Sequence, residues 1–471
     1  MSFKNRKDQF GISVNIIRNL SSPFFKRIYD LLKSSFQESK IPEELLISKV
    51  IPIPKCKNPG INDLRPITLQ PTLMRIIDKI ISFKMLKMIE LEKLDETQHG
   101  FIRNKSCDTN VFSFISFIHK SLEEKKKIIV VYVDLKKAFD SICFDSLLKM
   151  LHSHGICSLF LKWIKSYLYN RKQFVEINGV ASKISKITSG VPQGSVGGPK
   201  YFNITFSRIK ESENCKIFKY ADDMKILFSV DSEDKEKSET TMNAELDRIN
   251  LELGEMNLSI NMEKTFYMSI ANSESYNIKI NGKNIEKKTL IRDLGLFYDN
   301  YLNFDEYYKL ITKKYVQRCI HISKCITSNK MKEFTYKFYA RPVIEHCNGI
   351  FNPSKKLLKK KFDKIHKRFC RSIKGFQRNN LLKFEELPSF RQTYKSLILI
   401  HKDEHNVLKI NPSGRSRLTS KRFIAGKFFK NLAIFRSLPN FYNNLKDKKK
   451  ALLKKDDFYK YMKGEILKVN P

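Results

Sequence analysis

The chain of 471 residues contains no apolar run that approaches the about 20 residues of a membrane-spanning helix. Its first residues, MSFKNRKDQFG, lack the apolar core of a secretory signal. Nine cysteines lie scattered without short regular spacings, which favours reduced thiols of an intracellular protein over a disulfide framework or a zinc site. Internal repeats of solenoid length are also absent. These absences argue against the secreted, membrane-spanning and repeat classes.

Acidic residues are scarce in comparison with basic ones. The chain has 49 Asp and Glu against 88 Lys and Arg, a formal net charge of +39. Residues 351–471 alone hold 32 basic and 9 acidic residues. This excess favours a polyanionic partner, first nucleic acid and second an acidic membrane surface. With 41% hydrophobic residues the chain can still form folded cores, so wholesale disorder is not expected.

The N-terminal part of the sequence predicts helices before and after one β-hairpin. Apolar residues at helical spacing predict a helix over residues 14–39. Alternating apolar residues on both sides of a Pro-Gly turn predict a hairpin over residues 47–69, with Lys55 and Arg65 near its tip. A second helix is expected over residues 71–92.

The middle of the chain places three acids where strands end. The apolar run IIVVYV predicts a strand buried on both faces that ends at Asp134. Two further short strands enclose the sequence YADD, so that Asp222 and Asp223 occupy a tight turn. Asn-Gly pairs predict hairpins in two segments, 174–190 and 278–288. Helical, increasingly basic sequence follows, which together predicts α+β modules and an all-α tail.

If those strands are neighbours, the three carboxylates converge on one edge of a sheet. Like charges held a few ångströms apart are costly unless cations neutralise them. Hard oxygen ligands on a polyanion-binding protein suggest Mg²⁺, which binds one or two carboxylates together with substrate phosphates. Two such ions can activate a 3′-hydroxyl and stabilise a pyrophosphate leaving group. The alternative is that each acid is merely solvated, but the three settings together favour the metal site.

The chain resembles the reverse transcriptases of non-LTR retrotransposons of the jockey and LINE type over about residues 10–375. The motifs that carry the resemblance occur in that family's order: IPIPK, DLRPITL, QHGFIRNKS, VYVDLKKAFDSI, SGVPQGSVGGP, YADD, NLSINMEKT, DLGL, ARPVIEHCNGIFNP and KIHKRFCRSI. The resemblance implies an α+β right-hand polymerase with fingers, a palm with an antiparallel sheet, and a thumb. The implied regions are 1–125 (N-terminal extension and fingers), 126–275 (palm), 276–350 (palm end and thumb) and 351–471 (a basic helical C-terminal region).

The resemblance also implies the roles of the acids and of one aromatic residue. Asp134, Asp222 and Asp223 match the metal-binding catalytic triad of the palm. Phe139 matches the bulky residue that stacks below the incoming sugar and rejects a 2′-hydroxyl. Read without the motif, Phe139 could be an ordinary core aromatic on the helix after the strand.

Five further residues match positions that bind the nucleotide in this family. Gln193 resembles the residue that contacts the bound nucleotide, and Gly194 allows a close backbone approach. Lys55 and Arg65 resemble the finger cations that grip the triphosphate. Lys264 matches a lysine near the active site that assists pyrophosphate departure. Taken singly, Gln193 could cap a turn, and the cations could be solvated like many others in this chain.

Some features depart from the family pattern. Gly198 and Lys200 stand where large apolar residues are usual, which puts local packing or a template contact there in doubt. His99 replaces an aromatic residue and is expected to be a packing residue. Few residues precede the first predicted helix, so an endonuclease activity is expected to be supplied separately. The scattered acids of the tail do not predict a ribonuclease H module.

The basic tail begins with a predicted helix, KKLLKKKFDKIHKRFCR. Its apolar stripe consists of Leu357, Leu358, Phe362, Ile365 and Phe369. We expect this stripe to pack on the thumb and the cationic face to hold template or element RNA. A solvated charged face and an amphipathic membrane helix are the alternatives.

Together these observations predict an RNA-directed DNA polymerase. It is expected to use Mg²⁺, with Mn²⁺ as a substitute, and to bind an RNA template, a DNA primer and deoxynucleoside triphosphates. No stable membrane association is expected, and the resemblance implies a ribonucleoprotein in nucleus and cytoplasm. One alternative is a decayed or domesticated relative that only binds RNA. Another is a different palm polymerase, such as an intron maturase or an RNA-copying enzyme.

Overall fold

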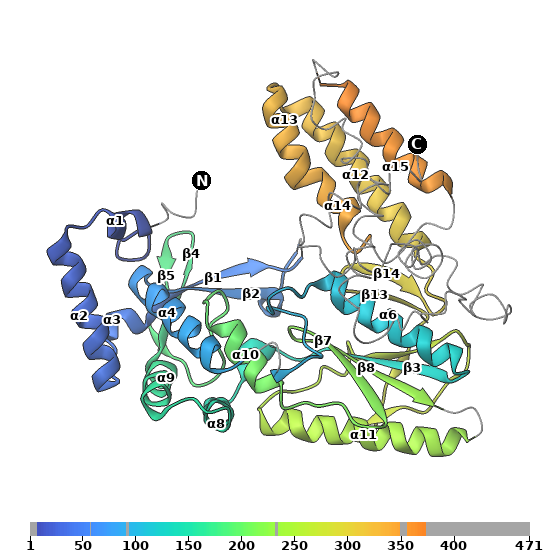
Figure 1. Ribbon diagram of the computed structural model, residues 1–471, viewed down its shortest axis with the longest axis horizontal. Helices are drawn as coiled ribbons and strands as arrows, with labels where there is room; N and C mark the ends of the chain where they lie inside the picture. Colours follow the sequence, from blue (N-terminus) through green and yellow to red (C-terminus); the bar gives the residue numbers. More distant parts are fainter. Residues whose placement is uncertain (1–6, 57, 91–93, 231–233, 349–355, 374–471) are drawn as a thin grey trace, which may run out of the picture.

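The computed structural model describes residues 7–56, 58–90, 94–230, 234–348 and 356–373 (Figure 1). Its centre is a five-stranded sheet in the order β12-β9-β3-β8-β7. The strands span Lys127–Val133 (β3), Cys215–Tyr220 (β7), Asp223–Val230 (β8), Phe266–Ile270 (β9) and Glu286–Lys287 (β12). The middle strand β3 is almost wholly buried, as its continuous apolar run predicts.

The two faces of this central sheet pack against different helices. On one face, Ile128, Val130 and Tyr132 join a core with the helix α6 (Cys107–Glu123). On the other face, Ile129 and Val131 belong to a second core. Among the helices that contribute residues to that second core are α8 (Phe144–Ser153), α9 (Ser158–Asn170), α10 (Gly198–Phe206) and α11 (Lys235–Glu255). Figure 1 shows α6 and α11 on opposite sides of the sheet.

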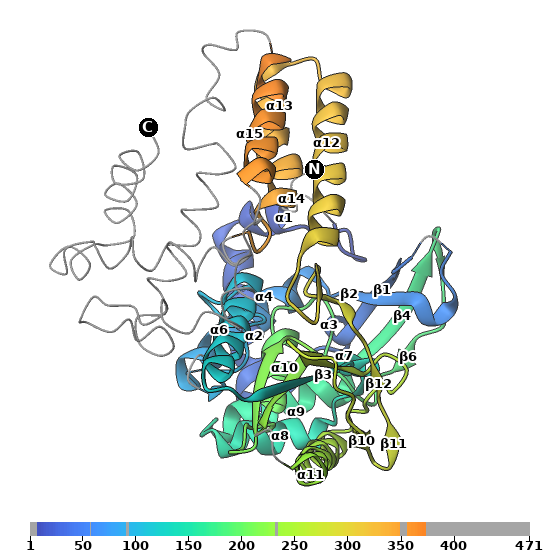
Figure 2. The same cartoon turned by 90° about the vertical axis from the view of Figure 1, so that its right-hand side faces the viewer.

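A second sheet carries the predicted hairpin. Strands β1 (Ile47–Pro54) and β2 (Leu64–Leu69) pair antiparallel, with Ile53 opposite Arg65, which confirms the hairpin and the position of Lys55 and Arg65 near its tip. A short helical turn, η2 (Ile61–Asp63), connects them. Strand β4 (Lys172–Ile177) runs parallel to β1 and pairs with β5 (Val180–Ala181) and β6 (Ser185–Lys186). Figure 2 shows this sheet extending away from the body.

The N-terminal helix differs from the prediction of one helix over residues 14–39. The structure has α1 (Val14–Arg18) and α2 (Ser22–Glu38) with a break between them. Pro23 lies in the first turn of α2, where backbone N–H groups have no partner within the helix, so the missing N–H of proline loses no hydrogen bond. In one continuous helix the same position would have to donate a hydrogen bond to the preceding turn. The remaining helices of this region are α3 (Glu43–Leu46), α4 (Thr72–Met88) and α7 (Ala138–Ser141). The helix predicted over residues 71–92 is α4, which ends at Met88.

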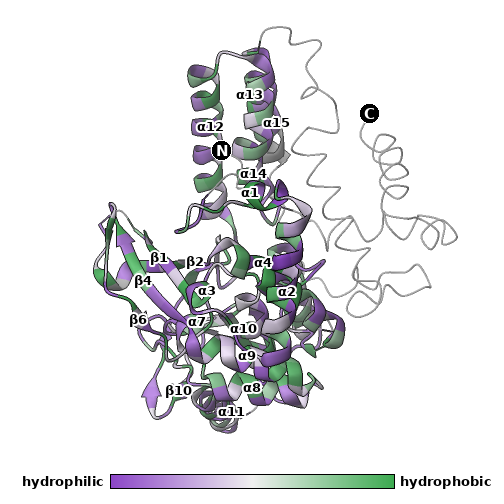
Figure 3. Cartoon of the chain, turned by 90° about the vertical axis from the view of Figure 1, so that its left-hand side faces the viewer, coloured by the Kyte–Doolittle hydropathy of each residue, from purple (hydrophilic) through white to green (hydrophobic). Residues whose placement is uncertain are grey.

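Beyond the central sheet the described chain is mainly helical, as predicted. Two short hairpins come first: β10 (Lys279–Ile280) with β11 (Lys283–Asn284), and β13 (Leu290–Asp293) with β14 (Leu296–Asp299). A helical bundle follows, made of α12 (Asp305–Cys325), α13 (Asn329–Thr335), the π-helical turn η3 (Tyr336–Ala340), α14 (Arg341–Glu345) and α15 (Lys356–Arg371). Figure 3 shows hydrophilic and hydrophobic residues alternating along α12, as an amphipathic helix requires.

The basic helix predicted after residue 351 is α15. Its Phe362 packs edge-on against Tyr315 of α12, with ring centroids 6.3 Å apart. Its Phe369 stacks on Tyr336 at 5.0 Å. The expected packing on the neighbouring helices is thus confirmed for these two residues, while the rest of the tail, 374–471, lies outside the described residues. In the ranges that the structure covers, no helix is both long and apolar enough to cross a membrane.

Candidate active site

The three acids predicted to converge do lie at one edge of the central sheet. Strands β3 and β8 pair antiparallel with Val133 opposite Met224, so Asp134 follows β3 at the edge where Asp223 begins β8. The turn between β7 and β8 holds Asp222 directly before it. The charge of Asp134 acts on both neighbouring acids. The sequence prediction of convergence is therefore confirmed.

The pKa of Asp222 and the pKa of Asp223 are both raised at this edge. Burial is the largest cause of the raised pKa of Asp223, about 6, and the charges of Asp222 and Asp293 add to it. The pKa of Asp222 is raised by burial and then by Asp134. Arg65 and Lys55 act in the opposite direction on Asp222, which places the hairpin cations within electrostatic reach of the acids. The edge therefore concentrates negative charge that the protein compensates only in part.

The raised pKa of Asp223 predicts a pH-dependent cost to stability. The pKa of Asp223 is about 6 in the folded chain, against the ordinary value of 3.8 for an unfolded chain. The folded chain therefore binds this proton more tightly. The free energy of unfolding should therefore fall as the pH rises from about 4 to about 6. At about pH 7.5 in metal-free buffer, Asp223→Asn should be more stable than wild type by about 1 kcal/mol, because solvent at the exposed side chain screens part of the cost that the raised pKa implies, and no difference is expected near pH 4.

Denaturant unfolding at both pH values measures this difference. Asp30, exposed on α2, supplies the control variant Asp30→Asn, which should change stability little at either pH. An Asp223→Asn variant that is less stable than wild type at about pH 7.5 would contradict the charge account.

Asp134 is held by the NLSIN segment. The side-chain amide of Asn261 donates to Asp134 Oδ2 at 3.0 Å, and the Asn261 backbone N–H donates to the Asp134 carbonyl at 2.8 Å. The Asp134 N–H in turn donates to Thr265 Oγ1 at 3.3 Å. Lys264 is exposed on the same turn, where its N–H donates to the Asn261 carbonyl at 3.1 Å. The turn thus positions one acid and presents a cation nearby.

The YADD turn is clamped by a residue that the sequence reasoning did not single out. Ala221 adopts the left-handed conformation, with φ +55°. The buried side chain of Gln98 accepts from the Ala221 N–H at 2.8 Å and donates to the Ala221 carbonyl at 3.1 Å. The same Gln98 oxygen accepts from the Gly100 N–H at 2.8 Å. The QHGF motif, noticed only as part of the resemblance, therefore fixes the turn that carries two acids.

Gly100 should not tolerate a side chain. A Cβ at this position would come within 2.2 Å of the Ala221 nitrogen, so the YADD turn would have to move. We expect Gly100→Ala to destabilise the fold by about 3 kcal/mol, in the range of overpacked cores. The matched control is Gly254→Ala in α11, where a Cβ meets no atom within 4 Å and alanine should stabilise by about 0.5–1 kcal/mol. Unfolding curves of both variants measure this contrast, and equal stabilities would contradict it.

His99, by contrast, has the environment of a packing residue. Its ring nitrogen Nδ1 lies 2.8 Å from Thr109 Oγ1. The backbone N–H of His99 donates to the Lys219 carbonyl at 2.9 Å. Burial, followed by the charge of Lys105, lowers the pKa of His99 to about 3. The imidazole is therefore neutral in the ordinary pH range, in agreement with the packing role expected from the sequence.

The ring of Phe139, five residues after Asp134 in the sequence, is held in place by two aromatic neighbours. The ring is stacked on Phe202 at a centroid distance of 4.6 Å and meets Phe101 edge-on at 6.2 Å. Phe139 remains half-buried, so part of the ring is accessible. The residue is thus both anchored in the core and available to a ligand above it.

Gln193 is oriented by Asp140, another residue that the sequence reasoning missed. The side-chain amide of Gln193 donates to Asp140 Oδ1 at 2.9 Å, and the backbone carbonyl of Gln193 accepts from the Thr68 N–H at 2.7 Å. Burial raises the pKa of Asp140, while Gln193 and the nearby lysines lower it. Gly194 has φ +107°, and a Cβ there would lie 2.9 Å from the Thr68 carbonyl. The close approach that requires this glycine is thus to strand β2 of the chain itself.

The unusual lysine at the start of α10 has a buried acid nearby. Asp78 of α4 is 1% exposed and accepts from the backbone N–H groups of Val196 and Gly197 at 2.8 and 2.9 Å. Burial raises the pKa of Asp78, and the charge of the half-buried Lys200 opposes part of that rise. Gly198 is fully enclosed, since a Cβ there would meet the Pro192 carbonyl at 2.4 Å. Both departures from the family pattern therefore fit the local packing.

A buried ion pair between Lys225 and Asp293 lies next to the acids along strand β8. Lys225 and Tyr132 are opposite each other in strands β8 and β3, and Lys225 is two residues from Asp223 on the same face. The Lys225 ammonium is 2.7 Å from Asp293 Oδ2, and the Tyr298 hydroxyl donates to that oxygen at 2.9 Å. Asp293 belongs to the DLGL motif, so this motif closes the face of the sheet behind the site.

The described residues contain no group of three His, Cys, Asp or Glu side chains already arranged to hold a metal ion. Asp134 Oδ2 is engaged by Asn261, as described above. What the edge does provide is carboxylate oxygen, the ligand type that hard divalent cations prefer.

Comparison with known proteins places these features in context. Residues 53–336 match the protein family described as "Reverse transcriptase (RNA-dependent DNA polymerase)". The RNA-directed DNA polymerase from mobile element jockey of Drosophila melanogaster is 24% identical over 331 residues, 67% of this chain and 36% of that protein. The probable RNA-directed DNA polymerase from transposon BS of the same species is 23% identical over 307 residues, 60% of this chain and 32% of that protein. The chain thus spans about a third of the length of these relatives.

Among solved structures, telomerase from Candida Tropicalis in complex with a TWJ fragment of telomeric RNA is similar to this chain. The two are 12% identical, with a TM-score of 0.43, over 85% of this chain and 67% of that chain.

Proposed function

The chain belongs to the reverse transcriptase (RNA-dependent DNA polymerase) family, and from that membership we propose that it catalyses RNA-directed DNA synthesis. The α+β polymerase fold expected from the motifs follows from the same membership. The observation that carries the proposal is the meeting of Asp134, Asp222 and Asp223 at one sheet edge within electrostatic reach of Lys55 and Arg65. Acids to bind metal and cations to bind a triphosphate are the two requirements of nucleotidyl transfer.

Reverse transcriptases generally use divalent metal ions. We propose Mg²⁺, with Mn²⁺ as a substitute, held by Asp134, Asp222 and Asp223. These residues suit a hard cation because they offer only oxygen ligands and because burial and mutual repulsion raise the pKa of Asp222 and Asp223. When bound, such ions activate the primer 3′-hydroxyl and neutralise the leaving pyrophosphate.

The protein's own residues would bind and orient the nucleotide. Lys55 and Arg65 bind the triphosphate, Arg65 through its two-pronged guanidinium. Phe139 supports the sugar and excludes a 2′-hydroxyl. Gln193, fixed by Asp140, presents the remaining oxygen of its amide to the nucleotide. The role of Lys264 is to assist the departure of pyrophosphate from the exposed turn beside Asp134.

The proposed substrates are a DNA primer paired with an RNA template, and deoxynucleoside triphosphates. An endonuclease activity that creates the primer end is part of the same proposal. A ribonucleoprotein present in nucleus and cytoplasm is the cellular form that the sequence resemblance favours.

Primer extension tests this function. Purified protein should extend oligo(dT) on poly(rA) with dTTP in the presence of Mg²⁺, and a chelator should stop the reaction. Offering UTP in place of dTTP separates a reverse transcriptase from an RNA-copying polymerase. If folded protein binds the duplex but does not extend it, the chain is an RNA-binding relative without this activity.

A further inference from the structure

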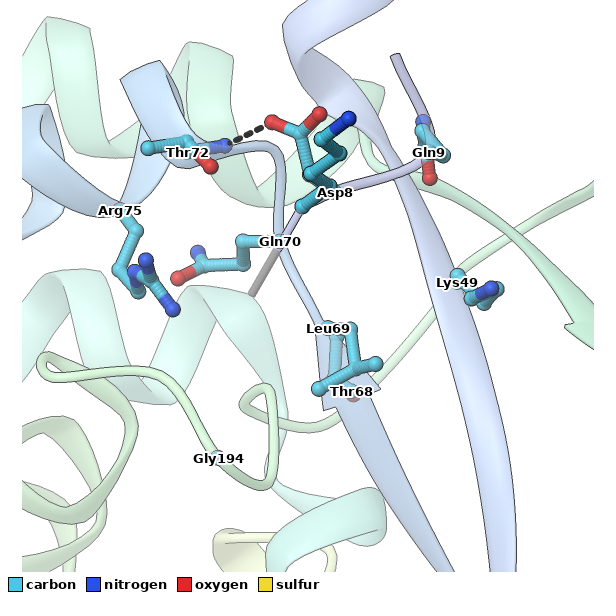
Figure 4. A pocket seen from close by; sticks show the side chains of 10 residues that line it. Asp8, Gln9, Lys49, Thr68, Leu69, Gln70, Thr72, Arg75 and Gly194 are labelled. Carbon is cyan, nitrogen blue, oxygen red and sulfur yellow. Dashed lines mark hydrogen bonds between the residues drawn. The ribbon is translucent and has the colours of Figure 1, made fainter. Parts of the chain in front are cut away.

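Residues 190–197, which include Gln193, form a loop without helix or strand that leads into α10. Figure 4 shows Gly194 of this loop next to Thr68 of strand β2. A loop without regular structure keeps one conformation only when other groups satisfy its backbone N–H and C=O groups. The residues that bond to the ends of loop 190–197 therefore decide where Gln193 lies.

The first end of the loop is held by Arg171, which directly follows α9 and is 3% exposed. Its guanidinium donates a hydrogen bond to the Gly190 carbonyl. The same group lies over the rings of Phe144 and Tyr167, 5.5 Å from each ring centroid. Because two rings enclose it, the guanidinium cannot turn to solvent and stays directed at this carbonyl. A charged donor also makes the hydrogen bond stronger than a neutral one.

The other end of the loop is held by Asp78 of α4, the buried acid described above. A single oxygen, Oδ2, accepts from both the Val196 and the Gly197 N–H groups. The fit is close, since a Cβ at Gly197 would lie 2.5 Å from the second oxygen, Oδ1. Gln193 thus lies midway between the contact that Arg171 makes and the contacts that Asp78 makes.

The two residues that hold the loop carry opposite charges. Burial raises the pKa of Asp78, and the charge of Arg171 opposes part of that rise. A charge that is buried without an opposite charge nearby is costly, so each residue stabilises the other in its buried, ionised form. Arg171 and Asp78 therefore hold the loop as a pair, although they come from different elements of the fold.

The first end of the loop also bonds to the segment that carries Phe139. The Val191 N–H donates to the Phe139 carbonyl at 2.7 Å, and the Gly190 N–H donates to the Ile142 carbonyl at 2.8 Å. A shift of Gly190 would therefore move the backbone of Phe139 as well as that of Gln193.

We propose that Asp78 and Arg171 are positioning residues of the nucleotide site, which fix loop 190–197 from its two ends so that Gln193 and Phe139 meet the incoming nucleotide. Both side chains are buried and act through the backbone of the loop. The inference rests on the proposed polymerase function, because it takes Gln193 and Phe139 as nucleotide contacts. A residue that only maintained the fold would change the amount of active protein, whereas a positioning residue changes nucleotide affinity and selection in the protein that is folded.

Steady-state extension by Asp78→Asn and Arg171→Lys tests the proposal. Asparagine keeps the shape but weakens two charge-assisted hydrogen bonds, and lysine keeps the charge but loses the planar guanidinium. Each variant should raise KM for dTTP about tenfold with kcat within about threefold of wild type, and lower the preference for dTTP over UTP about fivefold. Arg171→Met, which also removes the charge, should have a larger effect than Arg171→Lys.

Leu246→Ala is the control for stability, since it removes a buried side chain of α11. It should lower Tm while KM for dTTP and the preference over UTP stay at the wild-type values. If folded Asp78→Asn and Arg171→Lys likewise kept both quantities, the two residues would only maintain the fold and the proposal would be wrong.

Hydrogen exchange tests the hold on the loop without requiring turnover. The Val196 and Gly197 amides should exchange at least about tenfold faster in Asp78→Asn than in wild type, while the amides of β3 keep their protection. Unchanged exchange would overturn the role of Asp78 even in a protein that extends primers. If wild-type protein extended no primer, the proposed function would fail and the nucleotide role of both residues with it, whereas exchange would still show whether Asp78 holds the loop.

Discussion

Asp222→Asn should lower the rate of primer extension by about a thousandfold or more while leaving the affinity for the primer–template duplex within about twofold of wild type. Asparagine keeps the size of the side chain but removes the charge that a divalent cation requires. The turn should survive the change, because Gln98 clamps it through the backbone of Ala221 and not through the side chain of Asp222. Single-turnover extension and equilibrium binding on the same preparation measure both quantities.

The control for this variant is Glu213→Gln, an exposed acid just before β7. It makes the same change of formal charge away from the sheet edge and should extend primers at the wild-type rate. If Asp222→Asn retained more than about a tenth of wild-type activity, the assignment of the acids would be wrong, whatever the family resemblance implies.

Phe139→Ala should reduce the preference for deoxynucleotides over ribonucleotides by about 100-fold, which corresponds to about 2.7 kcal/mol. The ring is fixed on Phe202 at 4.6 Å and braced by Phe101, so it cannot move aside to admit a 2′-hydroxyl. Removing the ring opens that space without changing the acids. The ratio of kcat/KM for dTTP and UTP measures the preference.

Phe139→Tyr is the matched variant for this prediction, since it keeps the ring and should keep the preference for dTTP. If Phe139→Ala instead lost activity with both nucleotides equally, the residue would be an ordinary core aromatic, the alternative that the sequence left open.

Local patterns predicted the parts of the site that depend on nearby residues. The apolar run before Asp134 required a buried strand, and the short strands around YADD required a tight turn. These two signals predicted that the acids converge if the strands are neighbours in one sheet, and the pairing of β3 with β8 meets that condition. The hairpin that carries Lys55 and Arg65 followed in the same way from alternation and a Pro-Gly turn.

Contacts between distant polar residues could not be predicted in this way. Gln98 and Ala221 are 123 positions apart, and Gln193 lies 53 positions from Asp140. No local pattern in the sequence links the members of either pair, and only the packed fold shows which residues meet. The missed break between α1 and α2 has a different cause, since the apolar spacing continued through a segment that Pro23 interrupts.

The central claim is that the three acids bind a nucleotide through divalent metal on an RNA template. A primer terminated with a dideoxynucleotide tests it directly, because the complex forms but cannot react. With Mg²⁺, the next complementary dNTP should make the wild-type complex resist a competitor duplex. Without Mg²⁺, or in Asp134→Asn and Asp222→Asn, that nucleotide should have no effect. Equal stabilisation of the wild type and both variants would contradict the account, as would a wild-type complex indifferent to the correct nucleotide.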